Sequence, residues 1–208
     1  MTENRYSAAD IKVLDFIEHI RRRPGMYFSV GPDNPALATH VLHHVLGSAL
    51  HPDARLAPDH TLRVSAEISA NLAFAVTDDQ AGPTDSQGMP ALGYYDSLLG
   101  PDRLWSAAAA ALSHRAVVEV WRDGRGLRQV LAAMRPETAP KQFEPPHGSG
   151  TRVAFELDPD YFSPLAAISS DLGSLDLHRP HCAEGGGSGH VVIRDLRTGA
   201  IPAEWHYS

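Results

Sequence analysis

Residues 6–27 carry the most structural information in this sequence and read Y-S-A-A-D-I-K-V-L-D-F-I-E-H-I-R-R-R-P-G-M-Y. The apolar residues recur at helical spacing, and Ser7 followed three residues later by Asp10 resembles the capping box that starts a helix. Proline disfavours helical geometry in the residue before it, so the helix is expected to end at Arg23-Pro24-Gly25. The stretch therefore predicts an N-terminal helix closed by a sharp turn.

The composition is that of an ordinary folded domain. The 208 residues are 43% hydrophobic and 21% charged, which is enough apolar material for a core. Eighteen basic residues against 25 acidic ones give a net charge of −7, which does not favour direct binding to nucleic acid. A single cysteine excludes an internal disulfide and fits a reducing cytoplasm. No stretch approaches about 18 consecutive apolar residues, and the first residues lack a signal-peptide core, so a cytoplasmic protein without membrane contact is expected.

Downstream of the first helix, the hydrophobic pattern alternates between helical and extended periods. Helices are expected over 35–50, 104–113 and 164–172, the first of them with Asn34 as its N-cap. Period-2 alternation predicts hairpins over 62–76, 116–134 and 190–207, and a further strand over 151–157. Residues 80–104 are rich in glycine and proline and have no clear period, which is typical of a lid or binding loop.

This order of elements predicts an α+β fold, specifically a two-layer sandwich with one mixed sheet and helices on one face. The chain shows no internal repeat and no composition change that would mark a second domain. We therefore expect a single domain over 1–208, with residues 1–15 as an N-terminal arm and residues 80–104 as a lid.

Residues 6–27 resemble the opening of the B subunit of DNA gyrase and its topoisomerase relatives, where the stretch runs Y-(x)4-I-K-V-L-(x)5-V-R-K-R-P-G-M-Y-I-G. The resemblance extends over nearly the whole chain and implies the ATPase fold of that family, called GHKL or Bergerat. Asp78 and Gly82 match the D-D-G-R-G signature, whose aspartate reads adenine, and Gly150-Thr151 match the G-T that opens a late strand. Further matches are the R-Q pair at Arg128-Gln129 and the closing I-R-D-x-R-x-G at 193–199. None of the family's transducer, toprim or DNA-gate domains follows, so a stand-alone domain is expected.

Two residues of the family's catalytic helix are replaced in this sequence. The resemblance implies an E-x-x-x-N motif, in which the glutamate is the general base and the asparagine holds Mg²⁺ on the phosphates. Aligned without gaps, these positions are His43 and Gly47. A glycine offers no side-chain ligand, and a histidine does not favour the adjacent Mg²⁺ as a carboxylate does. We therefore expect neither ATP hydrolysis by the family mechanism nor a bound metal.

The phosphate-binding loop also departs from the family. The resemblance implies G-x-x-G-x-G, in which bare backbone N–H groups approach the phosphates. Residues 100–105 read G-P-D-R-L-W, so only Gly100 remains and Trp105 brings an indole to the last glycine position. The arginine of D-D-G-R-G is absent as well, whereas Asp78 and Thr151 are retained. The sequence thus predicts a preserved base-reading half and a dismantled triphosphate half.

The second helix carries a cluster of histidines. On a helical wheel, His40, His43, His44 and His51 fall within about 100°, opposite the apolar face. Such an arc is typical of a solvated polar face, but the resemblance implies that this helix edge borders the nucleotide. The resemblance also implies that Tyr6 of the arm reaches the nucleotide of a partner chain, so a homodimer is expected.

These observations favour a module that binds an adenine nucleotide (ATP or ADP) or a purine-like small ligand with little or no hydrolysis. Asp78 would read the base, Thr151 would hold a bridging water, and Arg128 and Arg103 would contact the polar end. The remaining candidate ligand contacts are Gly82, Gly100, Tyr6, His40 and Trp105. One alternative is a repurposed small-molecule enzyme, with His43 as acid or base beside Asp78. Another is a regulator or antibiotic decoy of a gyrase B subunit.

Overall fold

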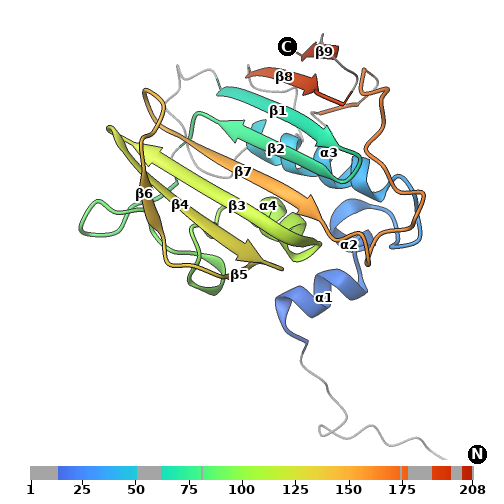
Figure 1. The fold of residues 1–208 in the computed structure, drawn as a ribbon, viewed down its shortest axis with the longest axis horizontal. Helices are drawn as coiled ribbons and strands as arrows, with labels where there is room; N and C mark the ends of the chain where they lie inside the picture. The colour runs from blue at the N-terminus through green and yellow to red at the C-terminus, as the bar shows by residue number, and fades with distance from the viewer. Residues whose placement is uncertain are drawn as a thin grey trace, which may run out of the picture.

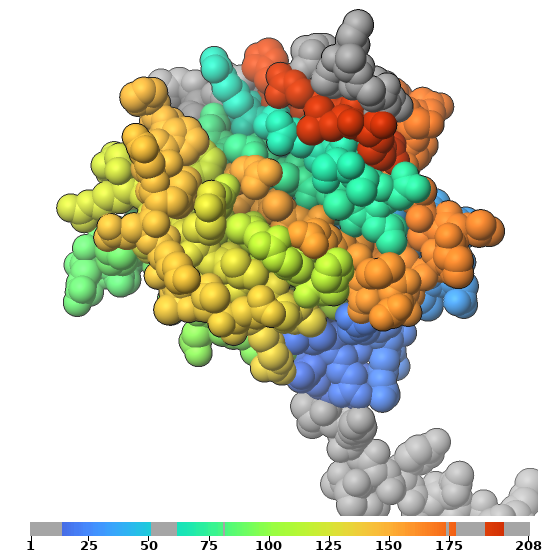
Figure 2. Space-filling model, in the orientation of Figure 1, coloured from blue at the N-terminus to red at the C-terminus, as the bar shows by residue number. Residues whose placement is uncertain are grey.

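The fold is a two-layer α+β sandwich, and a computed structural model describes residues 14–50, 62–80, 82–173, 175–177, 189–197 and 203–207. One face of the sheet is covered by helices, which lie behind the strands in Figure 1. Figure 2 shows the other face, where the strands themselves form the surface. The predicted fold class is therefore confirmed.

Within these described residues, the sheet has nine strands in the order β5-β4-β3-β7-β2-β1-β8-β9, with β6 also pairing with β4. The strands are β1 (Leu62–Ala70), β2 (Ala73–Asp78), β3 (Ser113–Arg122), β4 (Arg125–Ala132), β5 (Arg135–Pro136), β6 (Lys141–Phe143), β7 (Gly150–Leu157), β8 (Gly189–Asp195) and β9 (Ala203–Tyr207). β1 and β8 run parallel, whereas the other pairs are antiparallel, so the sheet is mixed as predicted. The pairing β1–β8 joins the two halves of the chain.

The helical layer consists of α1 (Phe16–Arg22), α2 (Gly25–Phe28), α3 (Leu37–Leu50) and α4 (Leu104–Ala111), with a short 3-10 turn η2 (Tyr94–Asp96). Leu42 and Leu46 of α3 are fully buried in one core with Phe74 and Phe155, whose ring centroids are 4.9 Å apart. The alanines of α4 are also fully buried, since their small side chains bring this helix close to the sheet. No helix within the described residues is long and apolar enough to cross a membrane.

Local signals place several element boundaries. The Asn34 side chain accepts a hydrogen bond from the Ala36 N–H at 2.9 Å, just before α3. Asp123 and Gly124 both have positive φ, 51° and 74°, in the tight turn between β3 and β4. Pro24 follows the end of α1, as predicted, but it begins a further one-turn helix, α2.

Two helix predictions need correction. α1 begins at Phe16, where the Asp15 carboxylate accepts from the Glu18 N–H at 2.7 Å, whereas Ser7 and Asp10 lie outside the described residues. The helix predicted over 164–172 is wrong, because this segment is irregular. The Ile168 N–H donates to the Asn71 carbonyl at 2.8 Å, so tertiary contacts take the backbone groups that a helix would use.

Candidate functional site

Asp78 is the last residue of β2 and lies in a buried row that crosses the sheet. It pairs in register with Thr151 of β7, which in turn pairs with Val120 of β3. Only 3% of Asp78 and 1% of Thr151 is exposed. A carboxylate so deeply buried requires hydrogen-bonding or charged partners, and their identity decides what this site can bind.

Arg103, immediately before α4, supplies those partners. Its Nη1 donates to Asp78 Oδ2 at 2.6 Å, and its Nη2 donates to Asp78 Oδ1 at 2.9 Å and to the Gln80 carbonyl at 3.1 Å. Burial lowers the pKa of the Arg103 guanidinium, but the Asp78 charge and hydrogen bonds outweigh burial and hold this pKa above its ordinary value. The result is a bidentate ion pair between two charged groups of the chain itself.

This pair nearly fills the space beside Asp78. The remaining cavity is about 20 Å³, between α3 (Ser48), β2 (Val76), Gln80 and Arg103. Such a volume holds one water molecule, whereas a purine needs several times more. In this structure, the place predicted for a base beside Asp78 is therefore taken by Arg103.

The oxygen atoms around the Arg103 guanidinium already accept hydrogen bonds from it or from neighbouring residues. Thr151 Oγ1 donates to the Gln80 carbonyl at 2.7 Å, and Asp78 Oδ1 also accepts from the Gln80 N–H at 3.1 Å. Arg103 thus meets three oxygen acceptors, two from Asp78 and one from Gln80. The site matches a group that only donates hydrogen bonds, whereas adenine presents a ring-nitrogen acceptor beside its amine donor.

The two replaced positions of the catalytic helix are not grouped with Asp78. The His43 ring nitrogen Nε2 is 2.7 Å from the Asp176 carbonyl oxygen, and Gly47 is buried within α3. Since a helix rises about 1.5 Å per residue, His43 lies about 7 Å along the axis from Ser48, which borders the cavity. His43 and Asp78 thus have separate partners.

The predicted histidine face of α3 is divided between surface and core. His40 is half-buried, and burial together with nearby His43 lowers its pKa, so it is neutral at pH 7. His44, by contrast, is 4% exposed, so the prediction that it lies on a solvated face is wrong. The reason is that α2 and α4 pack against a second side of α3, in addition to the sheet. The fourth histidine, His51, lies outside the described residues.

Trp105 of α4 occupies part of the corner where the family's phosphate loop is expected. Its ring is stacked on His44 with centroids 4.8 Å apart, and it also contacts Phe28 at 6.1 Å and Tyr27 at 6.3 Å. Gly100 is buried, and its carbonyl accepts from the Arg103 N–H at 3.0 Å in the turn that leads into α4. An aromatic cluster and a closed turn thus stand where a glycine-lined loop would leave backbone N–H groups open.

Other predicted contacts lie apart from Asp78 and Arg103. Arg128 is held by Glu119, with Nε to Oε1 at 2.6 Å, on the open face of the sheet. Its neighbour Gln129 is 2% exposed on the helical face, where it accepts from the Leu98 N–H at 2.8 Å. Successive residues of a strand point to opposite faces, so Arg128 is directed away from the helical side. Tyr6 and the rest of residues 1–13 lie outside the described residues.

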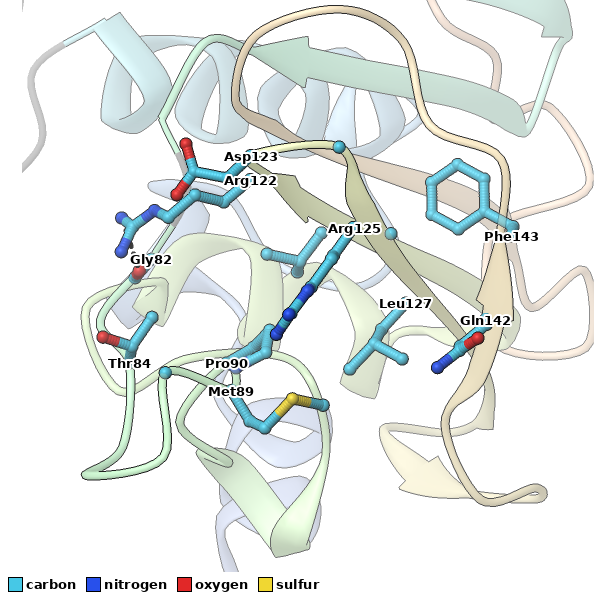
Figure 3. Close-up of a pocket in the computed structure, with 14 residues that line it drawn as sticks. Gly82, Thr84, Met89, Pro90, Arg122, Asp123, Arg125, Leu127, Gln142 and Phe143 are labelled. Atoms are coloured by element: carbon cyan, nitrogen blue, oxygen red, sulfur yellow. Dashed lines mark hydrogen bonds between the residues drawn. The ribbon is translucent and has the colours of Figure 1, made fainter.

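A larger cleft, missed by sequence reasoning, lies between the lid and the β3–β4 hairpin (Figure 3). Its volume is about 650 Å³, and its walls include Gly82, Met89, Val120, Arg125 and Phe143. The Gly82 carbonyl accepts from Arg122 Nη2 at 3.2 Å, which ties the lid to the hairpin. The arginines that flank the Asp123-Gly124 turn were the sequence signal for this cleft. Tertiary packing brings the lid beside them, and the sequence pattern does not encode that packing.

The chain is similar in sequence to the B subunits of type II topoisomerases, whereas no family model matches it. It is 32% identical over 177 aligned residues to the B subunit of DNA topoisomerase 4 from Caulobacter vibrioides, covering 76% of this chain and 25% of that protein. It is 27% identical to the B subunit of DNA gyrase from Synechocystis sp., covering 100% of this chain and 20% of that protein. Identity to the gyrase B subunit of Thermus thermophilus is 31%, over 77% of this chain and 28% of that protein. The chain spans about a quarter of the length of these relatives.

Proposed function

Because this chain is a distant homologue, over most of its length, of the N-terminal region of gyrase and topoisomerase IV B subunits, we propose that it is a binding module whose pocket beside Asp78 takes up no adenine nucleotide and that it does not hydrolyse ATP. The observation that carries this proposal is the ion pair of Arg103 with Asp78, which occupies the place predicted for a base. An adenine nucleotide enters this pocket only after the guanidinium leaves, and it then has to compete with a tethered group that is always present at high effective concentration.

Loss of hydrolysis has a second, independent support in α3. At the two positions that the family resemblance assigns to base and metal ligand, this chain has His43, hydrogen-bonded to the Asp176 carbonyl, and the buried Gly47. Neither residue contributes the oxygen ligands that Mg²⁺ prefers. These residues therefore favour the loss of ATP hydrolysis, independently of the closed pocket beside Asp78.

The two alternatives from the sequence have no observation in their favour among the described residues. The enzyme hypothesis pairs His43 with Asp78, but His43 contacts Asp176 while Asp78 contacts Arg103. The hypothesis of a gyrase regulator rests on the N-terminal arm, and residues 1–13 lie outside the described part of the chain.

A thermal-shift titration with ATP, ADP and adenosine, each with Mg²⁺, tests the proposal. A dissociation constant of about 100 μM at about 1 mM ligand would add roughly 1.4 kcal/mol and raise the melting temperature by about 3–6 °C. The native chain is expected to shift by less than about 1 °C with each ligand and to release no phosphate from ATP. A clear ATP-dependent shift of the native chain would overturn the proposal. So would phosphate release from ATP whose rate changes in Arg103→Ala, because that change would assign the activity to this pocket.

A further inference from the structure

The cleft between the lid and the β3–β4 hairpin has the size and lining of a small-molecule site. Its volume of about 650 Å³ lies within the range of roughly 300–1,000 Å³ that is usual for ligand pockets. Its apolar side chains are Met89 and Pro90 of the lid and Val120 and Leu127 of the hairpin, whereas the Phe143 ring lies against Arg128 on the other face of the sheet. Two segments that are distant in sequence, the lid and the hairpin, thus converge on one apolar space.

The positively charged side chain of Arg125 extends into this cleft. Figure 3 shows the Arg125 side chain extending from the hairpin toward Pro90, while the Asp123 carboxylate is turned to the other side of the turn. Arg125 is exposed, and within the described residues its guanidinium has no ion-pair or hydrogen-bond partner. The side-chain amide of Gln142, beside Leu127 on the same wall as Arg125, adds a neutral donor and acceptor.

We propose that this cleft binds a small amphipathic anion, with an apolar ring system as its body and one carboxylate, sulfonate or phosphate group. The body packs on Met89, Pro90 and Leu127, and the anionic group meets the Arg125 guanidinium, whose planar donors match two oxygens of such a group. This inference goes beyond the proposed function, because it requires neither Asp78 nor the opening of its pocket.

The position of the cleft makes this site distinct from the base pocket. Val120, which lines the cleft, is separated from Asp78 by β7, since Thr151 stands between them in the same row of the sheet. Arg103, Asp78 and Gln80 line the small cavity, whereas none of them lines the larger cleft. A ligand in the cleft therefore leaves the ion pair of Arg103 and Asp78 in place.

Two fluorescent dyes of the same shape test the inference in the full chain. 8-Anilinonaphthalene-1-sulfonate carries the anionic group, and N-phenyl-1-naphthylamine is the same ring system without it. The native chain is expected to bind the sulfonate saturably with one site and more tightly than the neutral dye. Arg125→Gln is expected to weaken the sulfonate by at least about fivefold, the effect of losing one charge-assisted hydrogen bond, and to leave the neutral dye unchanged.

Two further variants separate this site from general charge and from unfolding. Arg63→Gln removes another exposed arginine, on β1 and outside the cleft, and is expected to leave both dyes unaffected. Leu127→Asn makes the floor polar and is expected to weaken both dyes, with the melting temperature recorded to confirm folding. The inference is overturned if Arg125→Gln leaves the affinity for the sulfonate intact, if Arg63→Gln lowers that affinity equally, or if binding of the sulfonate does not saturate.

Discussion

Arg103→Ala is expected to lower the free energy of unfolding by about 3–5 kcal/mol, the range for breaking a buried ion pair from one side. The physical reason is that the Asp78 carboxylate, 3% exposed, loses both donors of the guanidinium and, among the described residues, keeps the Gln80 N–H alone. Urea unfolding, with the midpoint and slope compared to the native chain, measures the loss.

Variants of the partner separate the charge effect from lost packing. Asp78→Asn leaves the guanidinium buried without the carboxylate that it hydrogen-bonds, with Asp102 as a remaining nearby charge, and is expected to cost about as much as Arg103→Ala. The double variant Asp78→Leu with Arg103→Met replaces the pair by apolar groups of similar size, and it is expected to be more stable than either single variant. If Arg103→Ala costs less than about 1 kcal/mol, the pair does not hold the pocket closed and the argument from it fails.

Arg103→Ala also opens the space that the guanidinium filled. Methylguanidine at low millimolar concentration is then expected to raise the melting temperature of this variant and not that of the native chain, because it restores a purely donating group to three acceptors. Adenosine is expected to have the smaller effect on the variant, since Thr151 Oγ1 already donates to the Gln80 carbonyl. An equal or larger effect of adenosine would show that the site still prefers a base.

The parts of the fold that could be predicted are those specified by local signals. The Asp123-Gly124 turn and the period-2 alternation of β1 each act over a few residues, and both are confirmed. The Asn34 side chain accepts from the Ala36 N–H, but α3 begins at Leu37, two residues after the predicted first helical residue. The segment 164–172 was misassigned because the Ile168 N–H bonds to Asn71, about a hundred positions away, and no local pattern encodes that contact.

The candidate site shows the same division between local and tertiary information. Sequence reasoning named Asp78, Thr151 and Arg103, and the structure brings them together. The sequence indicated that Arg103 contacts a ligand, whereas the structure shows that it pairs with Asp78. An ion pair between residues 25 positions apart depends on the path of the lid between them, and no local pattern encodes that path. Strand alternation alone places Arg128 and Gln129 on opposite faces of the sheet. Because Gln129 is buried on the helical face, Arg128 is on the face away from Asp78 and Arg103.

Trp105→Ala is expected to lower the free energy of unfolding by about 3 kcal/mol, at the lower end of the range for truncating large aromatic side chains. The indole is stacked on His44 of α3 and contacts Tyr27 and Phe28 of α2, so its removal leaves a cavity where three helices meet. Urea unfolding gives the magnitude. Leu104→Ala is the matched control, because Leu104 is 36% exposed on the same helix and its loss is expected to stay within about 0.5 kcal/mol.

The same variant separates stability from ligand binding. Removing the indole opens space beside α3, but Arg103 still holds Asp78, so Trp105→Ala is expected to gain no thermal shift with ATP. Trp105→Phe keeps an aromatic ring against His44 and is expected to recover more than half of the lost stability. If Trp105→Ala alone gained ATP binding, the indole rather than the guanidinium would be the group that keeps nucleotides out. A loss no larger than that of Leu104→Ala would mean that the aromatic cluster does not hold α4 in place.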